Sequence, residues 1–156
     1  MAWFKSKTAA EAPTPVTPER IEEALARQEL TVDRADDGAP RFYCIINGFP
    51  VIVDASFPFA VVFSASTFER LPVEREEEVL GWAKTVNAGT HFVTTVKNVD
   101  DDGIYAAADG MLFIEGGLTE EQLDEQIELM LVGTLSTMGS FCQEFDLEPG
   151  TPGEDN

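Results

Sequence analysis

The stretch RFYCIINGFPVIVD, residues 41–54, determines how the fold is read. It holds two runs rich in β-branched and aromatic residues, and Asn47-Gly48 separates them. A type I′ turn needs positive φ at both central positions, which an Asn-Gly pair tolerates, so the stretch predicts a β-hairpin. A further run, FAVVFSA at residues 59–65, follows closely. Together with a short edge strand expected at residues 31–35, these runs predict an antiparallel meander.

Helical patterns lie on both sides of this meander. Thr17 is placed to cap a helix that starts at Pro18 and ends near Leu30, because threonine suits the cap and proline the first turn. A second helix is expected to open at Pro72, and Asn87 and Gly89 are typical helix terminators. The apolar face expected to be buried in this second helix consists of Val79, Leu80, Trp82, Ala83 and Val86.

The C-terminal half predicts two strands and a long helix. The strands are expected at about residues 91–99 and 104–114, with Gly110 interrupting the second as a bulge or a bend would. Thr119 and Gln122 match a capping box, in which the two side chains bond to helix-end amides reciprocally. From there an apolar stripe with a helical period comprises Leu123, Ile127, Met130, Thr134, Met138, Phe141 and Phe145.

These elements predict one α+β domain over residues 17–147, an antiparallel β-sheet packed by helices on one face in the order α-β-β-β-α-β-β-α. Residues 1–16 are rich in Pro and Ala and are expected to form a flexible tail. Within this tail, Trp3 and Phe4 could dock on the domain or on a partner. Residues 148–156, EPGTPGEDN, are expected to be a disordered acidic tail.

The charge excludes several classes of function. The net charge is −19, and from Asn98 to Asn156 there are 15 carboxylates and no Lys or Arg. This distribution argues against binding to nucleic acid or to anionic membranes, because both depend on basic side chains. The sequence shows neither the apolar core of a signal peptide nor a run of about 20 apolar residues, so a cytoplasmic protein is expected.

Catalytic motifs are missing from the sequence, and we expect no enzyme and no cofactor. A small enzyme remains an alternative, using carboxylates or the single His91 with Cys44 or Cys142. Both cysteines lie in apolar stretches, where a thiol behaves as a small hydrophobe. No structural metal site is expected, since one His and two distant Cys cannot supply its ligands.

A weak calcium-binding module is a second alternative. The residues between 98 and 109 nearly match the calcium loop of an EF-hand, but the flanks have strand patterns and not helical ones. An acidic turn in a β-hairpin explains the same residues. The loop positions concerned are Asn98, Asp100, Asp102, Gly103 and Asp109.

Residues 129–143, LMLVGTLSTMGSFCQ, contain no charge within the predicted last helix. A helix on the surface of a domain should show a polar face, so this one is expected to be covered on several sides. Either it lies centrally across the sheet, or part of it meets a second protein. The residues predicted to bind a partner are Leu129, Val132, Leu135, Met138 and Phe141.

The order of elements, from Thr17-Pro-Glu19 through the meander of residues 41–65 to Leu118-Thr-Glu-Glu-Gln-Leu123, resembles the YbjN family. The helix ending at Val86-Asn87 and the strand pair around Asp102-Gly103 fit the same order. The family is labelled a bacterial sensory transduction regulator, and its fold is similar to that of type III secretion chaperones.

This resemblance implies an acidic, non-enzymatic interaction module, and chaperones of this fold are typically dimers that hold extended partner segments. We therefore expect a chaperone-like regulatory protein, a homodimer, that binds a protein partner. It would bury an apolar sheet or helix surface on that partner, while the surrounding carboxylates steer basic partners toward it.

Overall fold

The computed structural model describes residues 12–150. Its helices are α1 (Pro18–Arg27), α2 (Glu76–Gly89) and α3 (Glu120–Phe145), with a short 3₁₀ helix, η1 (Val73–Arg75), before α2. Its strands are β1 (Asp33–Arg34), β2 (Arg41–Ile46), β3 (Phe49–Asp54), β4 (Ala60–Ser66), β5 (Val93–Asp100) and β6 (Gly103–Phe113). The six strands form one antiparallel sheet in the order β1-β2-β3-β4-β6-β5, which confirms the predicted α+β class.

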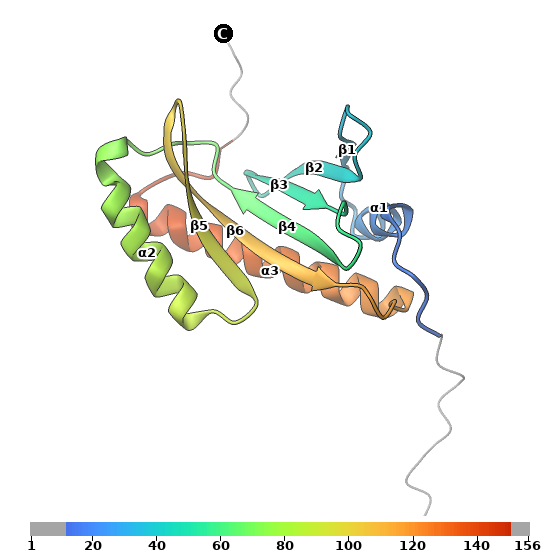
Figure 1. The fold of residues 1–156 in the computed structure, drawn as a ribbon. Helices are drawn as coiled ribbons and strands as arrows, with labels where there is room; N and C mark the ends of the chain where they lie inside the picture. Colours follow the sequence, from blue (N-terminus) through green and yellow to red (C-terminus); the bar gives the residue numbers. More distant parts are fainter. Residues whose placement is uncertain (1–11, 151–156) are drawn as a thin grey trace, which may run out of the picture.

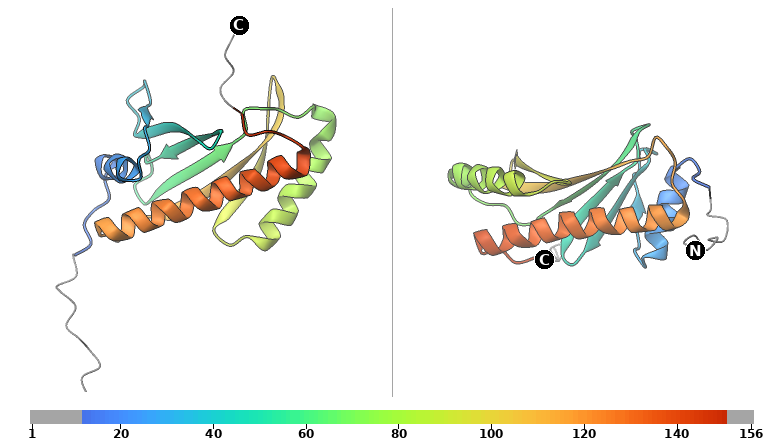
Figure 2. Two further views of the ribbon diagram at one scale, coloured as in Figure 1. Left: turned by 180° about the vertical axis from the view of Figure 1, so that it is seen from behind. Right: turned by 90° about the horizontal axis from the view of Figure 1, so that it is seen from below.

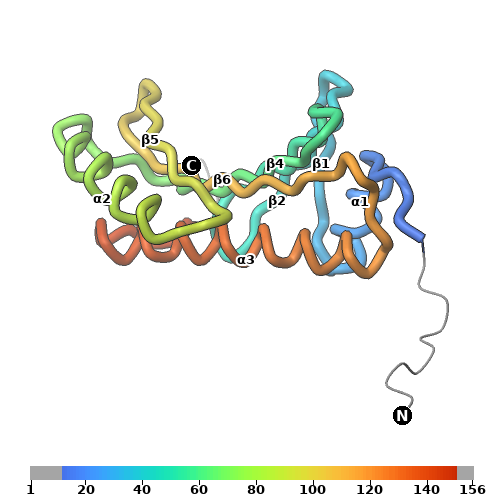
Figure 3. Tube along the Cα trace, turned by 60° about the horizontal axis from the view of Figure 1, so that its bottom comes forward, coloured from blue at the N-terminus to red at the C-terminus, as the bar shows by residue number. Residues whose placement is uncertain are grey.

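The helices pack against one side of the sheet (Figure 1). Seen from behind, α3 crosses the sheet diagonally, with α1 near its start and α2 beside its end (Figure 2). Alternate side chains of the strands point toward these helices, and Phe42, Val53 and Phe63 are buried there with the inner residues of α1 and α3. Along the other side of the sheet, the described chain places no helix (Figure 3).

The long helix α3 confirms the pattern predicted from its sequence. Thr119 accepts a hydrogen bond from the backbone of Gln122, and the Gln122 side chain accepts one from the Thr119 backbone. All seven members of the predicted stripe, from Leu123 to Phe145, are buried. No helix within residues 12–150 is long and apolar enough to cross a membrane.

Helix α2 differs from its prediction in two respects. Of its expected buried face only Val79 and Ala83 are buried, whereas Leu80 is exposed. The reason is that α2 packs along the outermost strand, β5, which covers only a narrow stripe of the helix. The helix ends at Gly89, one of its two predicted terminators, and not at Asn87, whose side chain bonds to β5.

Gly110 does not mark a bulge, so this prediction was wrong. The register of β6 runs without interruption, with Gly110 opposite Val93 on one neighbour and Phe63 on the other. A Cβ at this position would lie 3.0 Å from the sulfur of Met130 on α3. The glycine therefore lets the helix approach the sheet closely.

The described chain already contacts the domain before residue 17, the expected domain boundary. Thr14 forms an antiparallel bridge with Leu118, just before α3. At the other end, Pro149 and Gly150 lie against Gly48 and Phe68, so part of the expected acidic tail is also in contact with the domain. Trp3 and Phe4 lie outside the described residues.

Candidate functional site

The side of the sheet without helices, called the open face below, is the main candidate surface. Strand alternation places every second residue there, and the register brings these residues side by side. Val62 on β4 pairs with Met111 on β6, and Ser64 next to it lies between Ile52 and Asp109. The apolar members of the open face are Tyr43, Ile45, Ile52, Val62, Val96, Met111 and Phe113.

Much of the apolar area of the open face is accessible to solvent. Ile45, Ile52, Val96, Met111 and Phe113 are between 39% and 68% exposed. Figure 3 shows α3 along the opposite side, with the two ends of the sheet rising away from it. The open face thus groups several exposed apolar side chains on one sheet. Such a group marks an interaction site, whereas apolar residues scattered singly over a surface do not.

A hollow of about 390 Å³ lies at the β2–β3 end of this surface. Its lining is largely apolar and includes Tyr43, Ile45 and Ile52 of the open face, with Phe68 on the connection after β4. A largely apolar hollow of this size can accommodate apolar side chains of a partner.

One carboxylate lies within the open face. Asp109 on β6 is half-buried between Ser64 on β4 and Thr94 on β5. Its Oδ1 accepts a hydrogen bond of 2.6 Å from Oγ of Ser64. This bond fixes the carboxylate while leaving its other oxygen able to accept a bond from a donor on a partner.

The uncompensated charge of the surface is negative. Among the basic residues within the described range 12–150, every one except Lys84 forms an ion pair with a carboxylate of the same chain. Arg20 and Arg27 pair with the start of α3, for example, and Arg70 pairs with Asp100. The remaining carboxylates, some of which lie on the open face and others on the helices, favour a partner with basic residues.

The five residues predicted to bind a partner divide into two groups. Leu129 and Val132 are 42% and 58% exposed, and Leu135 is half-buried. Met138 and Phe141 are completely buried, so their prediction as partner-binding residues was wrong. The uncharged helix lies across the sheet, and this position explains most of its apolar character.

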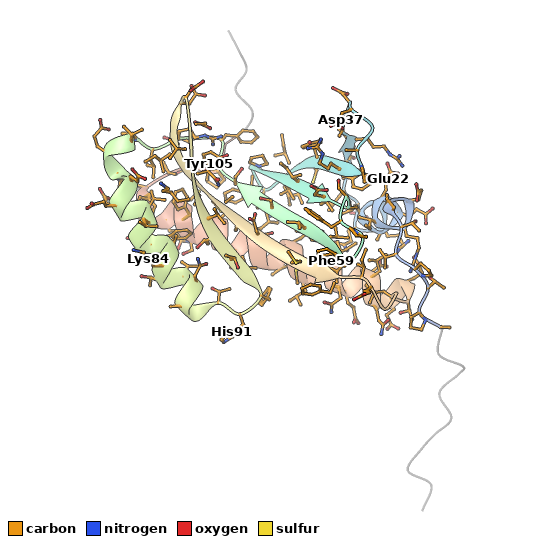
Figure 4. All side chains as sticks on the ribbon, in the orientation of Figure 1. Glu22, Asp37, Phe59, Lys84, His91 and Tyr105 are labelled. Carbon is orange, nitrogen blue, oxygen red and sulfur yellow. The ribbon has the colours of Figure 1, made fainter. Side chains whose placement is uncertain are left out.

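The cysteine and histidine residues do not form a site. Cys44 lies on β2, and three strands separate it from β5, before which His91 is exposed. Figure 4 shows His91 at the tip of the connection between α2 and β5, extending away from the sheet. Burial raises the pKa of the Cys44 thiol to about 11 and also raises the pKa of Cys142. Neither thiol has the lowered pKa of a reactive cysteine.

The calcium-loop alternative does not agree with the structure. Its ligand positions lie along the β5–β6 hairpin, where Asp100 accepts hydrogen bonds from the backbone of Asp102 and Gly103 and pairs with Arg70. Asp109 is six residues farther along β6 than Gly103, about 20 Å away in a strand. Among the described residues, no three His, Cys, Asp or Glu side chains group as metal ligands would.

Sequence reasoning did not identify the open face residue by residue. The available signal was that β6 is apolar in both phases of its alternation, with Leu112 facing the helices and Met111 and Phe113 facing away. Strands apolar on both sides are typical of sheets covered on both sides. In the described chain, helices cover one side of the sheet and nothing covers the open face.

Comparisons with known proteins cover most of the chain. The sequence model of the YbjN family, described as "Putative bacterial sensory transduction regulator", matches residues 17–135. This match runs from the cap of α1 into α3 and includes all six strands. A comparison with curated protein sequences finds no match.

Two solved structures share the fold. One is YbjN from E. coli, described as "a putative transcription regulator", with a TM-score of 0.69 at 12% identity, covering 85% of this chain and 96% of that chain. The other is an uncharacterized protein from Methanothermobacter thermautotrophicus, with a TM-score of 0.53 at 14% identity, covering 83% of this chain and 99% of that chain. At such identities the likeness concerns the fold alone.

Proposed function

The chain belongs to the YbjN family, and from this membership and its open face we propose that it is a regulatory module without catalysis that binds a protein partner. The observation that carries the proposal is the exposure of Ile52, Met111 and their apolar neighbours on one side of the sheet. Exposed apolar patches of this kind mark sites of interaction with other macromolecules.

The expected partner presents apolar side chains flanked by Lys or Arg. Its apolar side chains would cover the open face, and one of them would enter the hollow beside Ile45 and Phe68. Its basic residues would meet Asp109 within the face and the unpaired carboxylates around it. An extended segment, as in the chaperone-like mode of binding, suits this long and narrow surface.

A second candidate interaction is self-association through α3. Leu129 and Val132 form a small exposed apolar patch on the helix, with Leu135 half-buried beside them. We propose this patch as the contact of a homodimer. Three side chains bury far less than the roughly 800 Å² per partner of a standard interface, so we expect the dimer to be weak.

Photo-crosslinking in cells distinguishes the two surfaces. p-Benzoyl-phenylalanine placed at Met111 reports on the open face, at Val132 on the α3 patch, and at Lys84 on a charged helix surface as the control. We expect an adduct with another protein at Met111 and an adduct of the chain with itself at Val132. The partner is then identified by mass spectrometry and purified for binding measurements.

The specificity of the adduct is tested on the purified complex. Ile52→Glu, on the same face as Met111, should abolish binding and the adduct, whereas the matched variant Leu80→Glu, on the exposed side of α2, should keep both. Binding should weaken as salt rises, because the carboxylates are screened. If Met111 yields no adduct, or if Ile52→Glu and Leu80→Glu behave alike, the open face is not the binding surface.

A further inference from the structure

We propose that the hollow at the β2–β3 end of the open face is a binding site for an arginine side chain of the partner. The methylene stem of this arginine would lie on Ile45 and Ile52, and its guanidinium would meet the carboxylate of Asp33 and the ring of Tyr43. This inference rests on the proposed function, and it names the residue type that the partner presents to this end of the open face.

The hollow exists because the chain before β1 separates from β2. Strand pairing joins Asp33 to Tyr43 and stops there, although continued pairing would place Thr31 opposite Ile45. All four of these residues line the hollow of about 390 Å³. The hollow therefore opens between the segment before β1 and the end of β2, beside the apolar side chains of the open face.

The side chains that form the proposed contacts point to the same side of the sheet. Residues directly opposite in register share a face, so Asp33, Tyr43 and Ile52 form one row across β1, β2 and β3. Ile45 lies two residues after Tyr43 on β2 and has the same orientation. This side is the open face, because Phe42, at the alternate position of β2, is buried against the helices.

The outer end of this row carries negative charge. Asp33 is exposed and forms no ion pair with any residue in the range 12–150. A second hollow, of about 540 Å³, shares Asp33 with the first and includes Asp36, which also lacks an ion pair in the described chain. The two basic residues of this second hollow are already bound to carboxylates, Arg34 to Glu22 and Arg41 to Asp37. A cation at this end therefore meets unpaired carboxylates.

The backbone of Ile45 provides a further acceptor beside the hollow. A two-residue turn is closed by a hydrogen-bonded pair, which for the Asn47-Gly48 turn is Ile46 and Phe49. Because the hydrogen bonds of a strand alternate in direction, the carbonyl of Ile45 faces away from β3, toward the side where β1 pairing has ended. Within the described chain, no group donates a hydrogen bond to this carbonyl.

Arginine fits this set of groups better than other side chains do. Its planar guanidinium has enough donors for both Asp33 and the Ile45 carbonyl, and it stacks on aromatic rings such as that of Tyr43. Its methylene stem packs on apolar surface. Lysine carries a compact, more strongly hydrated charge that makes no flat contact with a ring. A purely apolar side chain would gain nothing from Asp33.

The test titrates N-acetyl-arginine amide into the full chain and follows its backbone amide signals by ¹⁵N NMR. We expect saturable shifts at Tyr43, Ile45 and Ile52, with a Kd of about 1 mM for a probe of this size. N-acetyl-citrulline amide has a side chain of the same length without the charge, and N-acetyl-lysine amide has the charge without the planar group. Both should bind severalfold more weakly.

Two variants separate a contact with Asp33 from the effect of net charge. Asp33→Asn should weaken binding of the arginine probe severalfold, whereas Glu128→Gln, which removes an exposed carboxylate from α3, should leave it unchanged. The inference is overturned if the citrulline probe binds as tightly as the arginine probe, or if the two variants behave alike. Shifts that spread over the acidic surface without saturation overturn it as well.

Failure of this inference and failure of the proposed function give different results. An adduct at Met111 without binding of the arginine probe overturns the inference and leaves the proposed function standing. Specific binding of the probe without any adduct at Met111 supports the arginine site and counts against the proposed function. Where both experiments succeed, Asp33→Asn should also weaken the purified complex severalfold, and an unchanged affinity would show that the partner does not use this site.

Discussion

The side-chain amide of Asn87 on α2 bonds to the main chain of Thr95 on β5 as a neighbouring strand would. Its Oδ1 accepts from the Thr95 N–H at 2.7 Å, and its Nδ2 donates to the Thr95 carbonyl at 3.0 Å. β5 is the outermost strand of the sheet, and edge strands invite pairing with other chains. Asn87 therefore satisfies the outward-facing N–H and carbonyl of Thr95 and blocks the edge near the start of β5.

Asn87→Ala should destabilise the protein by about 1–3 kcal/mol, because it leaves a buried N–H and carbonyl of Thr95 without partners. Urea denaturation measures the effect, and light scattering should show increased association through the freed edge. Thr85→Ala removes an exposed hydroxyl from the same helix and should change stability by less than about 0.5 kcal/mol. Equal effects of the two changes would contradict the role assigned to Asn87.

Two glycines of α3 should respond in opposite ways to alanine. At Gly139 a Cβ meets nothing within 4 Å, so Gly139→Ala should stabilise the protein by about 0.5–1 kcal/mol through helix propensity. At Gly133 a Cβ would lie 2.4 Å from the ring of Phe92 and 2.9 Å from Val93. Gly133→Ala should therefore be less stable than Gly139→Ala by about 1–2 kcal/mol in thermal or urea unfolding. A similar gain at both positions would exclude close packing at Gly133.

Much of the fold could be predicted because its signals are local. The Thr17 cap, the capping box of Thr119 and the stripe on α3 each depend on residues within one or two helical turns. The exposure of Leu80 follows from the place of β5 at the edge of the sheet. This place is set by the pairing of β6 with β4, which comes from an earlier part of the chain. Such pairing between distant segments leaves no periodic signal in either one.

The candidate surface was harder to predict than the core. An uncharged helix and a strand that is apolar on both sides each indicate an element that is covered on two sides. Neither pattern says whether the second side is covered by the same chain or by another protein. Met138 and Phe141 turned out to face their own sheet, whereas Met111 and Phe113 face solvent. Both pairs are apolar, and the position of α3 on one side of the sheet decides which pair is covered.

Alanine substitutions at buried and at exposed residues of α3 should change the free energy of unfolding by very different amounts. Phe141 packs edge-to-face against Trp82 with ring centroids 4.9 Å apart, and it is completely buried. Phe141→Ala should cost about 3–5 kcal/mol in urea unfolding, whereas the exposed Val132→Ala should cost less than about 0.5 kcal/mol. A small cost at Phe141 would mean that this side chain is not part of the core.

Cys44 should be slow to react with alkylating agents. Because burial raises its pKa from 9.0 to about 11, its thiolate fraction at pH 8 is about 100-fold below that of an unshifted thiol. Iodoacetamide labelling of Cys142→Ser should therefore be about 100-fold slower in the folded than in the urea-unfolded protein. Equal rates would show that Cys44 is accessible and unshifted.

The same shift has a consequence for stability. Between about pH 9 and pH 11 the folded chain keeps a proton on Cys44 that the unfolded chain releases, so stability should fall as the pH rises through this range. Cys44→Ala should reduce this slope relative to the parent protein. Urea unfolding at pH 8 and pH 10 provides the comparison, and an identical slope in both proteins would contradict the assignment.

Arg20 should hold the start of the described chain to the domain. Its guanidinium donates to the carbonyls of Thr14, Pro15 and Leu118 at 2.8–2.9 Å and pairs with Glu120 at the start of α3. Lysine cannot reproduce this planar set of donors, so Arg20→Lys should release the segment while keeping the charge. Hydrogen exchange at the Leu118 amide, which bonds to Thr14, should become faster.

The pattern of hydrogen exchange in Arg20→Lys also shows whether Arg20 holds residues 12–16 locally or stabilises the whole domain. Arg34 on β1 forms one exposed ion pair with Glu22, so Arg34→Lys is the matched control and should leave Leu118 exchange unchanged. In Arg20→Lys the faster exchange should be confined to the region around Leu118, while core amides such as Phe63 keep their protection. Uniformly faster exchange would instead mean that Arg20 stabilises the whole domain and does not specifically hold residues 12–16.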